Sequence, residues 1–134
     1  MNMKLHIVEA ADFIKSTPAG DLDLEASKAV LDRVCELARN LEDHRILIDL
    51  RNARSVLSTV DVWYLAEELG RYGGCFHRKT AVLLSQEGSV DQVRFFELAA
   101  QNRGHIVQIF CDFEQALYWL ASVEEINGSA SSCA

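Results

Sequence analysis

Apolar and polar positions follow two recurring patterns along this chain. Short, nearly continuous apolar runs are typical of strands in a covered sheet, and apolar residues three and four positions apart are typical of helices that pack on one side. The predicted strands are residues 4–10, 45–50, 79–85 and 105–111, with a weaker extended piece at 12–17. The predicted helices are residues 22–41, 58–73, 89–104 and 112–123.

The order of these elements predicts an α/β fold. Strands that alternate with helices favour a mostly parallel sheet with right-handed crossovers. We expect a mixed-edge sheet of four to five strands with about four helices, in which the first one or two strands supply an antiparallel edge. No linker rich in Pro, Gly or Ser interrupts the chain, so residues 1–123 are expected to form a single domain. The small, polar residues 124–134 are expected to form a flexible tail.

Charge and hydropathy narrow the range of partners and locations. The chain has 20 acidic and 13 basic residues, a formal net charge of −7. Such a surface repels phosphate backbones and anionic membranes, so neither nucleic acid nor a membrane is an expected partner. No apolar run approaches the length of a membrane span, and Glu9 and Asp12 come too early for a signal peptide. A cytoplasmic location is therefore expected.

The cysteines and histidines suggest no metal or redox site. Cys35, Cys75, Cys111 and Cys133 are far apart and form no C-x-x-C pair, so four free thiols are expected. Cys75 and His77 are close in sequence, but two ligands are not a site unless others converge on them. We expect neither a metal nor another cofactor.

No complete set of catalytic residues is present either. The glycine-rich loops that bind nucleotides must follow a strand and open a helix, and none does so here. Asp49 ends a strand as a phosphorylated aspartate would, but the carboxylate pair and lysine of such a site are lacking. Cys111 precedes a helix, where a thiol pKa can fall, but Asp112 and Glu114 oppose that effect. The chain is therefore not expected to be an enzyme.

The junction after strand 45–50 is the first candidate site. The hydroxyls of Ser58 and Thr59 stand where the next helix should begin. They can cap backbone N–H groups, or carry a phosphate that adds about −2 charge and about 1–3 charge-assisted hydrogen bonds. Arg51 and Arg54 are near enough in sequence to reach such a phosphate. The candidate interaction residues are Asp49, Arg51, Ser58, Thr59, Asp61 and Trp63.

This junction resembles that of STAS domains, the anti-sigma-factor-antagonist type, and more closely their SpoIIAA-like relatives with a CRAL-TRIO-like topology. The similarity rests on "ILIDLRNARSVL" before Ser58-Thr59, on "TVDVWYLAEEL" after it, and on "PAGDLDLEASKAVLDRV" and "IFCDFEQALYWLASV". The family motif is approximately D-x7-D-S-S-G. Counted from Asp49, the hydroxyls are kept at Ser58 and Thr59, whereas Leu57 and Val60 replace the second Asp and the Gly.

The resemblance implies a non-enzymatic protein-interaction module. Many of its members are switched when a kinase phosphorylates a hydroxyl at this junction, so the expected partner is another protein, such as a kinase or an anti-sigma-like regulator. Adjacent bulky side chains such as Trp63 and Tyr64 cannot both face one sheet, so one of each pair must face another helix, a partner or solvent. A homodimer is the expected assembly. The alternative, by analogy with the CRAL-TRIO-like topology, is a carrier or sensor of a small apolar ligand or lipid. Its expected pocket residues are Leu65, Phe95, Phe96 and Trp119.

Overall fold

The structure, a computed structural model, describes residues 3–8, 13–39, 45–72, 79–85 and 90–121. Its main sheet contains β1 (Met3–Val8), β2 (Phe13–Pro18), β4 (Arg45–Asp49), β6 (Thr80–Leu83) and β7 (Val107–Phe110). Its α-helices are α1 (Leu24–Ala38), α2 (Thr59–Glu68), α3 (Val90–Asn102) and α4 (Phe113–Ala121), and a 3-10 turn, η2 (Leu69–Tyr72), continues α2.

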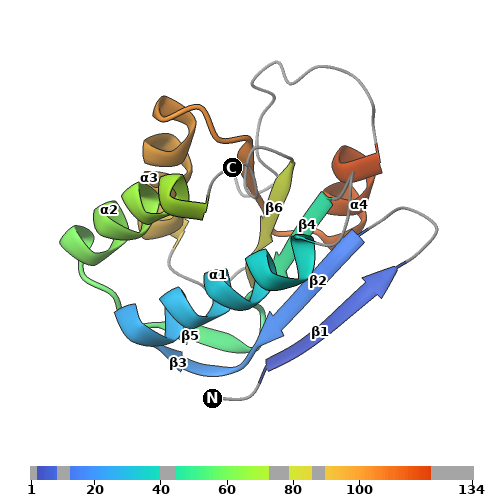
Figure 1. The fold of residues 1–134 in the computed structure, drawn as a ribbon, viewed down its shortest axis with the longest axis horizontal. Helices are drawn as coiled ribbons and strands as arrows, with labels where there is room; N and C mark the ends of the chain where they lie inside the picture. Colours follow the sequence, from blue (N-terminus) through green and yellow to red (C-terminus); the bar gives the residue numbers. More distant parts are fainter. Residues whose placement is uncertain (1–2, 9–12, 40–44, 73–78, 86–89, 122–134) are drawn as a thin grey trace.

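The sheet has the mixed edge that the sequence predicts. Its strand order is β1-β2-β4-β6-β7, with β1 antiparallel to β2 and each of the other neighbours parallel (Figure 1). The α/β class, the mostly parallel sheet and the antiparallel first strand are therefore confirmed.

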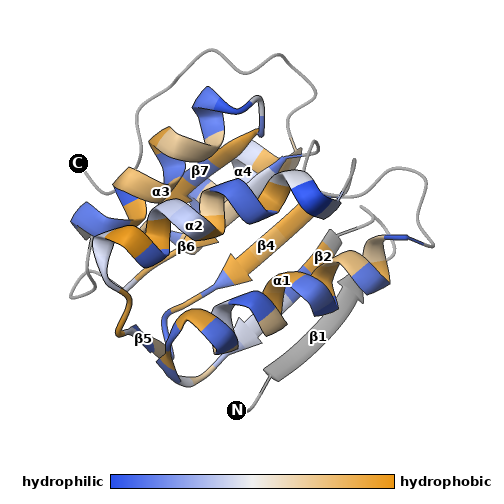
Figure 2. Ribbon diagram, turned by 60° about the vertical axis from the view of Figure 1, so that its left-hand side comes forward, coloured by the Kyte–Doolittle hydropathy of each residue, from blue (hydrophilic) through white to orange (hydrophobic). Residues whose placement is uncertain are grey.

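The two faces of the sheet carry separate hydrophobic cores. Ile46 and Ile48 of β4 belong to the core beneath α1, α2 and α3, and Leu47 belongs to the smaller core beneath α4. This division follows from the alternation of side chains along a strand. Figure 2 shows hydrophobic β4 running between α1 and α2 in that view. Because Asp49 lies two residues after Leu47, it falls on the α4 side.

A second, very small sheet joins two segments for which the sequence pattern predicts no strand. β3 (Gly20–Leu22) pairs in parallel with β5 (Ala53–Ser55). Gly20 has φ +86, a value that glycine adopts without steric cost. This pairing fixes the path of the chain between β4 and α2, so it positions the junction at Ser58. Strands of three residues are too short to show a period, which is why the pattern did not predict them.

Side chains of α3 form hydrogen bonds with the backbone along the outer edge of β7. The backbone N–H of Ile109 donates to Glu97 at 2.9 Å, and the amide of Gln101 donates to the carbonyl of Val107 at 2.8 Å. Groups on a sheet edge that would otherwise need water thus have partners within the chain.

The cysteines differ from the sequence expectation. Cys35 on α1 and Cys111 after β7 are each disulfide-bonded, so the prediction of free thiols is wrong for both. Spacing along a sequence does not reveal which cysteines approach one another in a fold. Cys75, His77, Cys133 and the predicted tail, 124–134, lie outside the described residues. Among the helices of the described ranges, none is long and apolar enough to cross a membrane.

Candidate interaction site at the start of α2

A capping box opens α2. The backbone N–H of Asp61 donates to Ser58 Oγ at 3.1 Å, and the backbone N–H of Ser58 donates to Asp61 Oδ2 at 3.1 Å. Two N–H groups that the helix leaves without a helical acceptor are satisfied in this way. Ser58 thus has the capping role considered in the sequence analysis, and both Ser58 and Thr59 are exposed.

Asp49 and Arg51 form a pair on the other side of the sheet. Arg51 donates from Nε to Asp49 Oδ1 at 3.0 Å, from Nη2 to Oδ2 at 2.8 Å, and from its backbone N–H to Oδ1 at 3.0 Å. The Arg51 guanidinium also lies 5.4 Å from the ring centroid of Phe113 on α4, and Lys15 lies 5.3 Å from the same ring. Asp49 and Arg51 are therefore directed toward α4 and not toward Ser58.

The environment of Asp49 favours its charged form. Burial acts to raise the pKa of this carboxyl, since only 3% of the residue is exposed. The hydrogen bonds and the positive charge of Arg51, with the charge of Lys15, outweigh burial and lower the pKa below its usual value of 3.8. The same pairing raises the pKa of Arg51. Asp49 is thus an anchored structural anion.

Arg54 is also bonded to a carboxylate. Its Nε and Nη2 donate to the two carboxylate oxygens of Asp21 at 3.1 and 3.2 Å, across the β3–β5 pair. This contact is exposed on both sides. Both arginines that the sequence analysis placed within reach of Ser58 and Thr59 therefore bind aspartates in this structure.

Apolar side chains are exposed beside the capped end of α2. Val60 is 73% exposed, and Trp63 and Tyr64 are 43% and 37% exposed. Residues three and four apart on a helix are neighbours, so Val60 adjoins both aromatic residues. Arg103 lies 5.4 Å from the Trp63 ring, and Lys28 lies 4.8 Å from the Tyr64 ring. We call Ser58, Thr59, Val60, Trp63 and Tyr64 the α2 surface.

A cavity of about 100 Å³ lies on the inner side of the same helix. Leu65 and Phe96, two of the residues proposed from sequence for an apolar pocket, line it. Phe95 does not line it, and Trp119 lies in the other core, 5.6 Å from the Phe110 ring. The structure thus brings two of those four residues together and separates the other two. Walls from α1, β3 and the β5–α2 connection depend on tertiary packing, and no sequence pattern indicated them.

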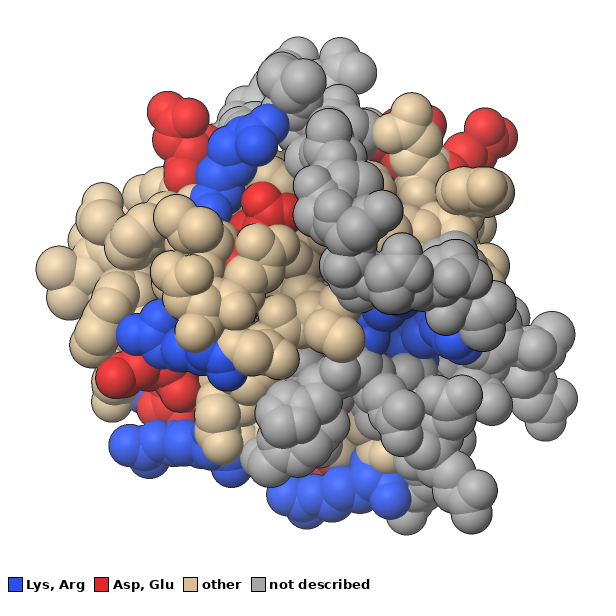
Figure 3. Space-filling view, turned by 90° about the horizontal axis from the view of Figure 1, so that it is seen from above, with Lys and Arg blue, Asp and Glu red and all other residues tan. Residues whose placement is uncertain are grey.

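Neither a patch of like charge nor an arrangement of possible metal ligands indicates another site in the described part of the chain. On the face seen in Figure 3, acidic and basic side chains are interspersed and not gathered into one patch. Among the described residues, no three His, Cys, Asp or Glu side chains are close enough together to hold a metal ion.

Comparison with known proteins gives the fold a name. No family model and no curated protein matches the sequence. Among solved structures, the anti-sigma factor antagonist SpoIIAA in its unphosphorylated form has a TM-score of 0.57 at 14% identity, covering 91% of this chain and 100% of that one. An uncharacterized DUF3478-family protein with a SpoIIAA-like fold from Shewanella loihica PV-4 has a TM-score of 0.54 at 19% identity, covering 89% and 92%. The chain has a SpoIIAA-like fold.

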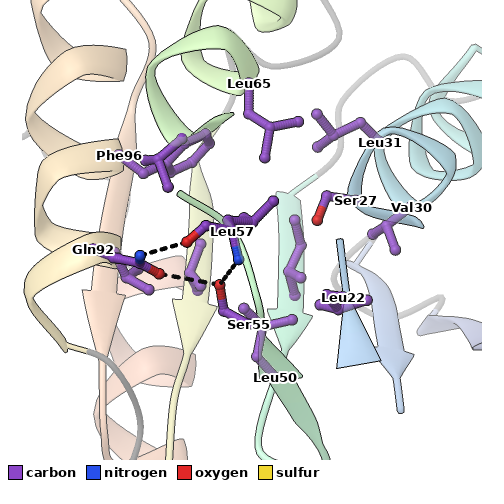
Figure 4. A pocket seen from close by; sticks show the side chains of 14 residues that line it. Leu22, Ser27, Val30, Leu31, Leu50, Ser55, Leu57, Leu65, Gln92 and Phe96 are labelled. Carbon is purple, nitrogen blue, oxygen red and sulfur yellow. Dashed lines mark hydrogen bonds between the residues drawn. The ribbon is translucent and has the colours of Figure 1, made fainter. Parts of the chain in front are cut away.

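In this SpoIIAA-like fold, Ser58 and Thr59 lie where the chain passes from β5 into α2. Ser58 is the N-cap of α2 and Thr59 is its first residue. The replacements at Leu57 and Val60 have visible consequences: Leu57 lines the cavity (Figure 4), and Val60 adds an exposed apolar side chain to the α2 surface.

Proposed function

We propose that this protein is a regulatory module that acts by binding another protein through the α2 surface, without catalysing a reaction. The observation that carries the proposal is the exposure of Val60, Trp63 and Tyr64 directly beside two exposed hydroxyls. Contiguous exposed apolar side chains mark interaction sites, and aromatic residues are enriched in interface centres. The fold comparison supports it, since a solved protein of the same fold is named as an antagonist of an anti-sigma factor.

We further propose that phosphorylation would act at Thr59 and not at Ser58. The Ser58 hydroxyl already accepts the Asp61 N–H, and a phosphate there would adjoin the Asp61 carboxylate. Thr59 is exposed at the first position of the helix, where the partial positive charge favours an anion. A phosphate would place about −2 charge next to Val60 and Trp63 and so change the surface that a partner meets.

Site-specific photocrosslinking tests the binding proposal. A photoreactive phenylalanine replaces Val60 in one protein and Tyr118 in the control, because Tyr118 is 80% exposed on α4. In lysate of the source cells, we expect an adduct of defined mass from position 60 and none from position 118. An adduct with twice the mass of the chain would identify a second copy as the partner. Equal labelling from both positions, or none from position 60, would contradict the proposal.

Two variants of Thr59 test the switch. Thr59→Glu carries a negative charge where the phosphate would lie, and Thr59→Ala removes the hydroxyl without adding charge. We expect the glutamate to change the adduct yield at position 60 by at least several-fold and the alanine to leave it unchanged. Equal yields from both variants would remove phosphorylation from the proposal while leaving binding in place.

A further inference from the structure

We propose that a groove at the carboxyl ends of α2 and α3 binds a small zwitterion, with its ammonium group at Glu68 and its carboxylate at Arg71 and Arg103. The groove has a volume of about 420 Å³, and the two helices pack side by side (Figure 2). Its walls come from the last turns of α2, from η2 and from the residues between α3 and β7. It adjoins the α2 surface at Tyr64, but the inference does not depend on the proposed function.

Glu68 gives the groove a carboxylate that is almost enclosed by protein. Only 10% of its side chain is exposed, and Glu68 lines the groove. Within the described ranges its carboxylate accepts no hydrogen bond, and Arg71 Nε lies 3.6 Å from Oε1, which is longer than a hydrogen bond. A nearly buried carboxylate without hydrogen bonds is unfavourable, so a ligand that donates to it gains the missing stabilisation. An ammonium group supplies both the donors and the opposite charge.

Two arginines supply positive charge to the same groove. The side chain of Arg71 is 73% exposed, and Arg103 is also exposed. Arg103 is held in place, because its Nη1 donates to the carbonyl of Ala99 at 2.9 Å and its guanidinium lies 5.4 Å from the Trp63 ring. A guanidinium keeps further N–H donors after one such bond, and their geometry matches a carboxylate. The arginines therefore favour a carboxylate at the exposed side of the groove.

The balance of charge favours one molecule with both groups over a simple cation or a simple anion. Two glutamates and two arginines line the groove, so their formal charges cancel. A lone cation would meet the arginines and a lone anion the glutamates, and Coulomb repulsion would offset part of the attraction in each case. Tyr64 adds a half-exposed ring to the wall, and its apolar face suits a short aliphatic link between the two charged groups. A short amino acid with its amino group at the end of the chain has this form.

The groove is open without rearrangement of the backbone. An added Cβ at Gly70 would meet no heavy atom within 4 Å, so this position of η2 borders open space. On the opposite side, the N–H groups of Arg103 and His105 both donate to the carbonyl of Ala100, at 3.0 and 3.1 Å, and fix the turn that follows α3. A preformed site of this kind costs little ordering on binding.

Backbone amide NMR tests the site with β-alanine, γ-aminobutyrate and δ-aminovalerate, in which the two charges are successively farther apart. We expect at least one of these zwitterions to shift the amide signals of Gly70, Arg71 and Gly104 saturably and to leave that of Leu120 unchanged. Butylamine and butyrate, which carry one charge each, should bind at least tenfold more weakly. Absence of saturable shifts with all the zwitterions would overturn the site. Equal binding of butylamine or butyrate would overturn the zwitterion class.

Two substitutions in the groove provide independent checks. Glu68→Gln keeps the shape of the side chain but removes its charge, and should weaken binding of the tightest zwitterion at least tenfold. Glu114→Gln makes the same change at an exposed position of α4 and should bind as the wild type does. Gly70→Leu places a side chain in the open space and should also weaken binding at least tenfold. If one groove variant does not fold, the other decides, and wild-type affinity in a folded groove variant would overturn the proposal.

Discussion

Two arginine–aspartate pairs with similar geometry but different burial allow the effect of burial on stability to be measured in one protein. Arg51–Asp49 and Arg54–Asp21 are both bidentate, with distances of 2.8–3.0 Å and 3.1–3.2 Å. The Asp49 side chain is 4% exposed, whereas that of Asp21 is 61% exposed. We therefore expect Arg51→Ala to lower the free energy of unfolding much more than Arg54→Ala does.

The magnitude follows from what each substitution leaves behind. Hydrogen bonds to charged groups contribute about 1.5–3 kcal/mol, and breaking a fully buried pair costs about 3–5 kcal/mol. Asp49 keeps the bond from the backbone N–H of residue 51, and 44% of the Arg51 side chain reaches water, which screens the pair. We expect a loss of about 2 kcal/mol for Arg51→Ala and a much smaller loss for Arg54→Ala, because water screens the exposed Arg54 pair.

Urea unfolding at several pH values is the assay. A carboxyl whose pKa is lower in the folded chain than in the unfolded chain stabilises the fold at pH values above its pKa in the unfolded chain, here 3.8. That stabilisation disappears as the pH falls through the lowered pKa of Asp49. The difference between wild type and Arg51→Ala should therefore be largest at neutral pH and shrink in acid. Equal costs for the two arginine variants, or a difference that does not change with pH, would refute this reasoning.

Three further predictions concern an acid, a core residue and the cysteines. Burial raises the pKa of Glu97, and this effect outweighs the lowering by its backbone hydrogen bond and by Arg94. The wild type should therefore lose stability, relative to Glu97→Gln, as the pH rises above 4.5. Urea unfolding that shows the opposite trend would contradict this. Leu120→Ala should cost about 2–5 kcal/mol, because Leu120 is fully buried, whereas the exposed Tyr118→Ala should cost under about 0.5 kcal/mol in the same assay. In denaturant without reductant, alkylation followed by mass spectrometry should leave Cys35 and Cys111 unlabelled; labelling of both would show that they are free thiols.

Strands β4, β6 and β7 of the main sheet were predictable because they are buried on both faces. Residues 45–50 and 79–85 are nearly continuous apolar runs, and such runs bounded by helical periods have few alternative structures. The β3–β5 pair was not predictable, since each strand contributes only three residues and the pairing joins positions more than 30 residues apart.

Of the candidate site, only the local capping of α2 by Ser58 was predictable from the sequence. Ser58 as the cap of α2 follows from a serine with an acid three residues later, a signal contained in four residues. The partners of Arg51 and Arg54 depend on which face Asp49 occupies and on the β3–β5 register, and neither can be read from the sequence. The separation of Trp119 from Leu65 has the same cause, because the two residues lie on helices that cover opposite faces of the sheet.

The bonds from Glu97 and Gln101 to β7 also bear on how this protein can associate. β-Augmentation, in which a peptide or a second chain extends a sheet through main-chain hydrogen bonds, would have to displace both side chains before it could begin at this strand. The same two contacts hinder the edge-to-edge stacking that starts fibril growth. An association at this edge of the sheet would therefore have to use side chains and not main-chain hydrogen bonds.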